Sequence, residues 1–245
     1  MEGVDFIIKA KGKKILVTVV TYNHEDYIKK VLEKFPNKRN YDVLILDDCS
    51  TDNTWKIVKE CNFKGIRNKV NIGVGSNIKN GIKYAIRNNY DVFVCLAGNG
   101  KDDPKEIPLI IKPIINENYD FVQSSRFLGQ YKNIPYFRIF AVKAYSKFFS
   151  IITKQNFSDV LSGFRAYKVN IFKDKRINIW KDWLNGYEFE TYLVYKLSTL
   201  NYKIKEVGVT RIYPKNKYSH IRPIIDWWNI IKPIFYLKLG IKKWK

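Results

Sequence analysis

Runs of apolar residues alternate with amphipathic segments along the first half of the chain. Residues 15–21 (ILVTVVT) form an unbroken run rich in β-branched side chains, which is typical of a strand buried on both faces. Residues 25–35 instead place Ile28, Val31 and Leu32 at helical spacing, so that they share one face. The same alternation predicts further strands at 42–47, 66–70, 91–97 and 119–124, and further helices at 52–60, 76–89 and 104–115.

This order of elements predicts the fold class. Strands that alternate with helices at such short spacing favour a parallel sheet covered by helices on both faces, a three-layer α/β/α domain. Residue types at the helix starts agree with it, because Ser76 suits a helix cap and Pro104 suits a first helical turn. Asp52 is more easily interpreted as a helix cap than as a ligand.

The second half of the chain is less regular. An aromatic-rich helix is predicted at 136–152, another helix at 186–199 and a strand at 203–209. The sequence has no internal repeat and no low-complexity linker, so residues 1–220 are expected to form one domain.

The tail from 221 to 245 mixes aromatic and aliphatic residues with lysines. Pro223 and Pro233 are expected to divide it into two short pieces. Such a mixture is typical of an amphipathic segment that lies on an anionic membrane surface. The alternative is a helix packed on the domain, with its aromatic residues in the core. No apolar stretch is long enough to predict an ordinary membrane span.

The charge narrows the classes of partner. The 245 residues carry 44 Lys and Arg against 23 Asp and Glu, a net charge of +21. A balance this basic indicates nucleic acid, an anionic membrane or a phosphorylated substrate as partner, unless the lysines merely cover solvated faces. Because no nucleic-acid-binding motif is present, we expect no nucleic-acid partner.

Two features predict the compartment. Lysines within the first 14 residues interrupt any apolar core of a signal peptide. Cys49, Cys61 and Cys95 have neither metal-ligand spacing nor a disulfide pattern, so they are expected to be reduced thiols. Both features predict a cytoplasmic protein.

Polar or small residues stand where the predicted strands end. Ligands of parallel α/β sheets bind outside the carboxyl ends of the strands, so these residues are the first candidates for a site. They occupy positions 21–23 (TYN), 47–48 (DD), 97–99 (AGN) and 124–126 (SSR).

These strand ends belong to stretches that, in order and spacing, resemble the family 2 glycosyltransferases, especially their dolichyl-phosphate mannose synthase-like branch. The stretches are VVTYNHEDYI (19–28), LDDCSTDNT (46–54), NIGVGSNIKNGI (71–82), LAGNGKDDP (96–104), SSRF (124–127), SGFRAY (162–167) and YEFE (187–190). The resemblance runs from Ile15 to about Pro214. It implies a GT-A fold, a GDP- or UDP-sugar type of donor, and transfer with inversion at the anomeric carbon.

The resemblance also implies a donor site. Tyr22 offers the nucleoside a stacking face and a hydroxyl, and Asp48 can accept hydrogen bonds from a base or a ribose. Gly73 allows the backbone to approach a ligand closely. The residues expected to bind the donor are Thr21, Tyr22, Asn23, Asp48, Asn71, Gly73, Gly98 and Asn99.

The sequence departs from the family at the DxD-type motif, whose carboxylates normally hold the divalent cation that binds the donor diphosphate. Aligned on Pro104, this position reads AGN (97–99), and both carboxylates are absent. Asn99 and Asp102 could still recruit Mg²⁺ or Mn²⁺, but metal binding is expected to be weakened or absent. Our hypothesis is that Lys101 places positive charge on the diphosphate instead.

Arginines of the second half are candidates for an acceptor site, because the planar guanidinium binds phosphate in a bidentate fork. Arg126 and Arg165 occupy the SSR and GFRAY positions, which lie near the acceptor phosphate in the lipid-phosphate branch. Arg138 is a third candidate, and surface ion pairs are the alternative for all three.

The need for a catalytic base depends on the acceptor. A phosphate dianion is already a nucleophile, whereas a sugar hydroxyl requires a carboxylate base. Glu188 and Glu190 are the candidates for that base, with Asp159 as a third. The alternative for the glutamates is a helix ion pair with Lys196 or a neighbour.

Together these features predict an inverting glycosyltransferase that moves a sugar from a nucleotide-diphosphate sugar to a polyprenyl- or dolichyl-phosphate lipid. It is expected to lie peripherally on the inner face of a membrane. The alternatives are transfer to a sugar hydroxyl in cell-envelope, capsule or O-antigen polysaccharide synthesis, and a non-catalytic protein that binds nucleotide sugars.

Overall fold

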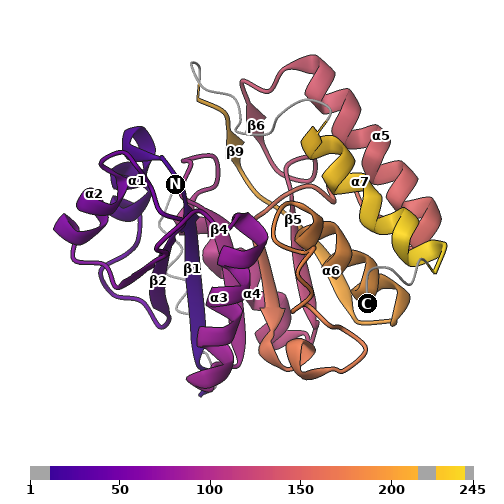
Figure 1. Cartoon of the computed structure of the whole chain (residues 1–245), viewed down its shortest axis with the longest axis horizontal. Coiled ribbons are helices and arrows are strands. Elements are labelled where there is room, and N and C mark those ends of the chain that lie inside the picture. Colours follow the sequence, from indigo (N-terminus) through magenta and orange to yellow (C-terminus); the bar gives the residue numbers. More distant parts are fainter. Residues whose placement is uncertain (1–11, 215–224, 241–245) are drawn as a thin grey trace.

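The computed structural model describes residues 12–214 and 225–240. A seven-stranded sheet runs through it in the order β3-β2-β1-β4-β7-β5-β8, and helices cover both of its faces (Figure 1). The strands of this sheet are β1 (Ile15–Thr21), β2 (Asp42–Asp47), β3 (Gly65–Arg67), β4 (Val92–Ala97), β5 (Phe121–Ser125), β7 (Arg165–Lys168) and β8 (Ile204–Gly208). The predicted three-layer α/β/α class is confirmed.

The helices begin close to where the apolar spacing predicted them. The α-helices are α1 (Glu25–Glu33), α2 (Thr54–Glu60), α3 (Val74–Arg87), α4 (Ile107–Asn116), α5 (Tyr136–Thr153), α6 (Glu188–Thr199) and α7 (Ile225–Lys238), and two short 3₁₀ turns are η1 (Pro104–Glu106) and η2 (Val169–Lys173). In the described part of the chain, β6 (Tyr131–Lys132) and β9 (Arg211–Ile212) form a separate two-stranded ribbon.

The alternation of side chains along the strands creates two cores. On β1, Leu16 and Val20 point into the core under α3 and α6, whereas Val17 and Val19 point into the core under α1, α2 and α4. Both faces of the central strands are therefore apolar, which explains why 15–21 lacks a polar face.

The sheet is mixed and not wholly parallel, which corrects the prediction. Strand β7 is inserted between β4 and β5 and runs antiparallel to both, with Cys95 and Gln123 each opposite Arg165. It was missed because only four residues form it and its partners are distant in sequence. Its reversed direction places its first residue, Arg165, at the edge where the parallel strands end.

One local prediction about a helix start was wrong. Ser76 does not cap α3, because the helix begins at Val74 after Gly73, whose φ of 88° suits glycine. Its hydroxyl instead donates to Asn185 Oδ1 at 2.6 Å. Asp52 behaves as predicted, since its carboxylate accepts bonds from the backbone N–H groups of Thr54 (2.9 Å) and Glu25 (3.1 Å).

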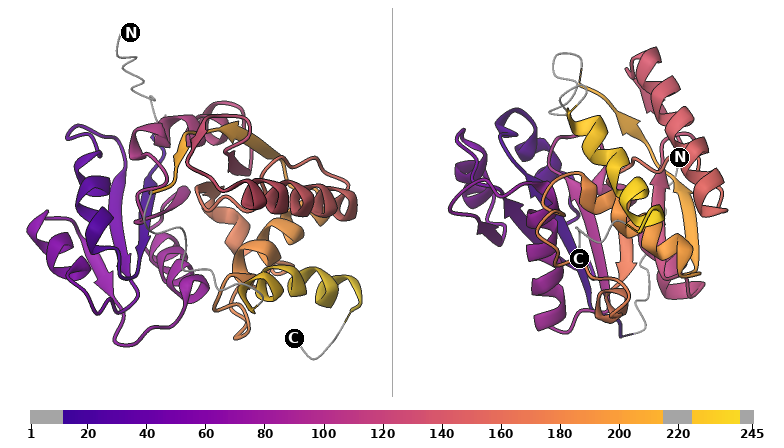
Figure 2. Two further views of the ribbon diagram at one scale, coloured as in Figure 1. Left: turned by 90° about the horizontal axis from the view of Figure 1, so that it is seen from above. Right: turned by 45° about the vertical axis from the view of Figure 1, so that its right-hand side comes forward.

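Helix α7 lies beside α6, on the side of the molecule that also carries α5 (Figures 1 and 2). It continues through Pro233, which was expected to divide the tail. Ile230 and Ile234 are buried in the core, and this packing outweighs the hydrogen bond lost at the proline. The first four residues of the predicted tail, 221–224 with Pro223, and its last five, 241–245, lie outside the described residues, as do residues 1–11 and 215–220. Within the described ranges no helix combines the length and apolarity needed to span a bilayer.

Candidate active site

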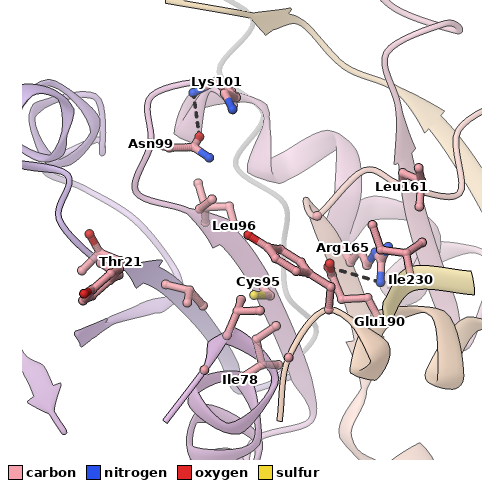
Figure 3. A pocket seen from close by; sticks show the side chains of 18 of the residues that line it. Thr21, Ile78, Cys95, Leu96, Asn99, Lys101, Leu161, Arg165, Glu190 and Ile230 are labelled. Carbon is pink, nitrogen blue, oxygen red and sulfur yellow. Dashed lines mark hydrogen bonds and ion pairs between the residues drawn. The ribbon is translucent and has the colours of Figure 1, made fainter. Parts of the chain in front are cut away.

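A pocket of about 830 Å³ opens at the edge of the sheet where β1, β2, β4 and β5 end and β7 begins. In Figure 3, Thr21 lies on one side of it and Arg165 with Glu190 on the other, while Asn99 and Lys101 stand above the end of β4. The pocket brings together almost every residue predicted for the site. Its lining includes Thr21, Tyr22, Asn23, Asp48, Asn71, Gly73, Asn99, Lys101, Arg126, Arg138, Arg165, Glu188 and Glu190.

Gly98 and Asp102 do not line the pocket. A side chain at Gly98 would come within 2.9 Å of Ile28 and 3.0 Å of Thr21, so this glycine serves close packing behind the site. Asp102 is fully buried, and its carboxylate forms an ion pair with Arg211 at 2.9 Å.

Hydrogen bonds fix the loops on the β1–β2 side. Asn23 has a positive φ of 51°, and its Oδ1 accepts a bond from the Thr51 N–H at 2.8 Å. The Asn23 N–H donates to Ser50 Oγ at 3.0 Å. The Asn23 amide is thus used to join the two strand ends, while its neighbours Thr21 and Tyr22 line the open pocket.

Asp48 organises the loop before α3. Its Oδ1 accepts bonds from Asn68 Nδ2 (2.9 Å) and the Ile72 N–H (3.0 Å), and its Oδ2 accepts one from the Gly73 N–H (2.9 Å). The aspartate therefore sets the position of the Asn71–Gly73 backbone at the pocket wall. Any ligand bond to this carboxylate would be made by an already oriented group.

Lys101 is buried beside other cations. Its Nζ lies 4.9 Å from the centre of the Tyr213 ring, so the ammonium faces an aromatic surface. Burial, together with the positive charges of Arg211 and Arg138, lowers the pKa of Lys101 to about 7. A ligand anion at this position would relieve that repulsion and favour the charged form.

Arg126 is held in one orientation by two partners. Its Nη2 donates to Asp159 Oδ1 at 3.1 Å, its Nε donates to the other carboxylate oxygen, and its Nη1 donates to the Tyr213 hydroxyl at 2.7 Å. Arg138, from the first turn of α5, lies with its guanidinium 5.6 Å from the same ring. Tyr213 therefore stands among three cations, and Asp159 is an orienting partner of Arg126.

Arg165 is anchored mostly by backbone. Its Nε donates to Ser162 O at 2.7 Å and its Nη2 to Val160 O at 3.0 Å, while Nη1 lies 3.4 Å from Glu190 Oε1. Strand β7 is antiparallel to its neighbours β4 and β5, so it begins where they end. Arg165, its first residue, therefore lies at the pocket edge of the sheet.

Glu188 forms an ion pair of 2.7 Å with Lys232 of α7. The two glutamates of α6 thus have partners other than Lys196, and one of these partners belongs to the C-terminal tail.

Comparison with known proteins agrees with this geometry. A model of the family described as glycosyl transferase family 2 matches residues 16–175. The chain belongs to this family. It is therefore a glycosyltransferase, as the motifs predicted. Many residues that line its pocket belong to the motifs at the strand ends that carried the resemblance.

Two relatives of known name align with most of the length of this glycosyltransferase. It is 29% identical over 93% of its length to a UDP-N-acetylglucosamine–dolichyl-phosphate N-acetylglucosaminyltransferase of Methanococcus voltae, of which it covers 97%. It is 24% identical over 80% of its length to an undecaprenyl-phosphate mannosyltransferase of Micrococcus luteus, of which it covers 83%.

A solved structure shows a similar fold. Glucosyl-3-phosphoglycerate synthase of Mycobacterium tuberculosis, crystallised with Mn²⁺, UDP and phosphoglyceric acid, superimposes with a TM-score of 0.70 at 18% identity. The match covers 94% of the transferase and 79% of that chain. The predicted GT-A fold is confirmed by this likeness.

The residues at the DxD position do not fit a conventional metal site. Asn99 Oδ1 accepts a bond from the Lys101 N–H at 3.2 Å, and Asp102 is committed to Arg211 outside the pocket. Among the described residues, no group of three or more His, Cys, Asp or Glu side chains could hold an ion. Hard divalent cations require several oxygen ligands, and Lys101, which lines the pocket two residues after Asn99, is itself a cation.

Some lining residues were missed. Tyr213 follows the ribbon strand β9, which is too short to be predicted from the sequence, and Arg211 of that strand lines the pocket as well. Asn229 and Ile230 line the pocket from α7, where the sequence predicted either a membrane contact or a helix packed on the domain, and no site residue. The available signal in the sequence was the proximity of Tyr213 to an arginine, Arg211, two positions earlier.

Proposed function

We propose that this glycosyltransferase moves a sugar from a nucleotide-diphosphate sugar to a polyprenyl- or dolichyl-phosphate lipid, with inversion at the anomeric carbon. The observation that carries the proposal is the grouping of charge in the pocket. Lys101, Arg126 and Arg138 all contact Tyr213. Arg165 lines the same pocket, across from Thr21 at the end of β1 (Figure 3).

The nucleoside is assigned to the side lined by Thr21, Tyr22 and Asn71. Tyr22 supplies an aromatic face there, and Asp48 is oriented by three hydrogen bonds to accept a further one from base or ribose. With the nucleoside in this position, the diphosphate of the donor lies toward Asn99 and Lys101, at the end of β4.

Lys101 takes the role of a diphosphate-binding cation in this proposal. Its ammonium, with a pKa of about 7 in the empty site, gains an anion when the donor binds and is then fully charged. It stabilises the negative charge that develops on the leaving diphosphate. Mg²⁺ or Mn²⁺ is correspondingly expected to be dispensable.

Arg126 and Arg138, with Arg165 nearby, receive the acceptor phosphate. An arginine whose fork is already fixed by Asp159 and Tyr213 loses little freedom on binding an anion. In the reaction an oxygen of the acceptor phosphate forms a bond to the anomeric carbon from the face opposite the diphosphate. The bond from that carbon to the diphosphate oxygen breaks, and the nucleoside diphosphate leaves with both electrons.

The second candidate acceptor is a sugar hydroxyl. Glu188 and Glu190 line the pocket, so a carboxylate base is within the same cavity. Glu188 is paired with Lys232 and Glu190 with Arg165, an arrangement that suits a base but also suits a purely orienting role. The names of the Methanococcus and Micrococcus relatives favour the lipid phosphate.

The location proposed for the enzyme follows from its acceptor. A lipid phosphate remains in the bilayer, so the pocket must work at a membrane surface, and a nucleotide sugar requires the cytoplasmic side. We therefore propose a peripheral position on the inner face of the membrane.

Product partition tests the function. The full chain is incubated with radiolabelled nucleotide sugars and polyprenyl phosphate, and the label is followed into an organic phase. Label in the organic phase, released by mild acid as expected for a sugar phosphate diester, supports the proposal. Label only in a soluble oligosaccharide would establish the hydroxyl acceptor instead, and binding of donor without transfer of label would establish a non-catalytic protein.

A further inference from the structure

Helix α5 has two unlike faces. Its inner face packs into the core through Tyr145 and Phe149. Its outer face exposes large apolar side chains three or four positions apart, so that they follow one line along the helix. We name this line the α5 stripe, and it consists of Phe137 (75% exposed), Phe140 (76%), Ala144, Phe148 (40%) and Ile151 (70%).

The stripe is more than scattered surface hydrophobicity. Single exposed apolar side chains are normal, but a contiguous apolar patch indicates a binding surface. Helix α7 does not cover it, because α7 meets the inner side of α5, where the Tyr145 hydroxyl donates to Ile230 O at 3.2 Å. Figures 1 and 2 show α5 along the outside of the molecule.

Lysines border one edge of the stripe. Lys143 and Lys147 are exposed on the turns between its aromatic members. Together with Asn156 and Ser158 they line a recess of about 350 Å³ beside the helix. Ser150 and two phenylalanines, Phe127 and Phe157, complete the lining. Two ammonium groups and three uncharged polar groups around one hollow suit an anionic headgroup, while the adjacent stripe suits acyl chains.

The same helix forms a wall of the catalytic pocket. Arg138 and Val142 line that pocket from α5, one turn apart, whereas Phe137 and Phe140 next to them face outward. A membrane in contact with the stripe would therefore be separated from Arg138, one of the cations assigned to the acceptor, only by the thickness of one helix.

We propose that the α5 stripe and its Lys143–Lys147 edge form the surface by which this protein sits on an anionic lipid bilayer. The purpose of this surface, the delivery of a lipid phosphate to the pocket, rests on the proposed function, whereas the membrane contact itself does not. A second copy of the chain is disfavoured as the occupant, because an antiparallel pairing of two stripes would bring their lysine edges together. The membrane contact is thus moved from the C-terminal tail to the middle of the chain.

Vesicle sedimentation tests the surface without any donor or acceptor. The full chain is mixed with phosphatidylcholine vesicles, with and without phosphatidylglycerol. Wild type is expected to bind the anionic vesicles best. Phe137→Ser combined with Phe140→Ser is expected to reduce the partition coefficient at least tenfold, because both rings leave the interface. Lys143→Gln combined with Lys147→Gln is expected to reduce it roughly twentyfold on anionic vesicles and little on neutral ones.

Two matched controls make the result specific. Lys29→Gln combined with Lys30→Gln removes the same charge from exposed positions of α1 and should leave binding unchanged. Trp228→Ser combined with Phe235→Ser removes exposed aromatic residues from α7 and should have a much smaller effect than the α5 change. Loss of binding only in the α7 variant, or unchanged binding of the α5 variants, would overturn the proposal.

Two further measurements separate the alternatives. A wild-type dimer in sedimentation velocity that becomes monomeric in the Phe137/Phe140 variant would assign the stripe to a second copy and overturn the proposal. Transfer to a short-chain, water-soluble polyprenyl phosphate should survive in the stripe variants. If vesicles bind through the stripe but no lipid phosphate accepts sugar, the surface stands and the proposed function fails.

Discussion

The hydroxyl of Tyr213 accepts a hydrogen bond from Arg126 Nη1 at 2.7 Å. This contact joins the strand end that carries the SSR motif to a residue about ninety positions later, just beyond the short ribbon. Because the ring of the same tyrosine also faces Lys101 and Arg138, one side chain sets the spacing of three cations.

The Tyr213→Phe variant tests this coupling. It keeps the ring and its contacts with Lys101 and Arg138 but leaves Arg126 with Asp159 as its remaining partner. We expect the KM for the lipid phosphate to rise about tenfold, as fits the loss of one hydrogen bond to a charged group, while the KM for the donor changes little. Steady-state kinetics with each substrate varied would show this. An equal effect on both substrates would contradict the assignment of Arg126 to the acceptor.

The affinity for the donor should depend on pH through Lys101. Its pKa of about 7 means that it is charged below this pH and increasingly neutral above it, so donor affinity should fall as the pH rises through 7. The esterified phosphates of a nucleotide sugar do not titrate in this range. Calorimetric titration across the range would show the fall. In Lys101→Arg the guanidinium stays charged, and the pH dependence should disappear.

A metal-dependent enzyme should be obtained by restoring the family pattern. The triple change Ala97→Asp, Asn99→Asp and Lys101→Gln supplies two carboxylates in the pocket and removes the competing cation. Transfer by this variant is expected to require Mn²⁺ or Mg²⁺ and to stop with EDTA, whereas wild type should continue in EDTA. Complete loss of wild-type activity with chelator, rescued by metal, would overturn the role given to Lys101.

The glutamates of α6 distinguish the two acceptor classes. For a phosphate acceptor no base is required, so Glu188→Gln and Glu190→Gln should each lower kcat less than about tenfold. For a hydroxyl acceptor, loss of the base should lower kcat by about 10²- to 10⁴-fold. Circular dichroism spectra are the control, because both changes break ion pairs with Lys232 or Arg165.

The local signals in the sequence were enough for the donor half of the fold. Strands β1, β2 and β4 are unbroken apolar runs, and most of the polar residues at their ends line one pocket, although Asp47 is buried behind it. Strand β7 could not be predicted, because its four residues owe their conformation to β4 and β5 on either side. For the same reason the resemblance could suggest Arg165 as a site residue, but its position in the sheet could not be predicted.

The acceptor half depended on contacts that no local pattern contains. Asp159 was a candidate base, yet its carboxylate is committed to Arg126 across 33 positions of the chain. Pro233 indicated a break, but burial of Ile230 and Ile234 against α6 sustains the helix. The aromatic content of 136–152 predicted a helix correctly without revealing that many of its aromatic side chains would face outward.

The central claim is that Arg126 and Arg138, the two arginines beside Tyr213, recognise an acceptor phosphate. The most direct measurement compares initial rates of sugar transfer to a polyprenyl phosphate and to the polyprenol of the same chain length, with the same labelled donor. The account predicts transfer to the phosphate and none above background to the alcohol. Comparable transfer to the polyprenol would contradict it.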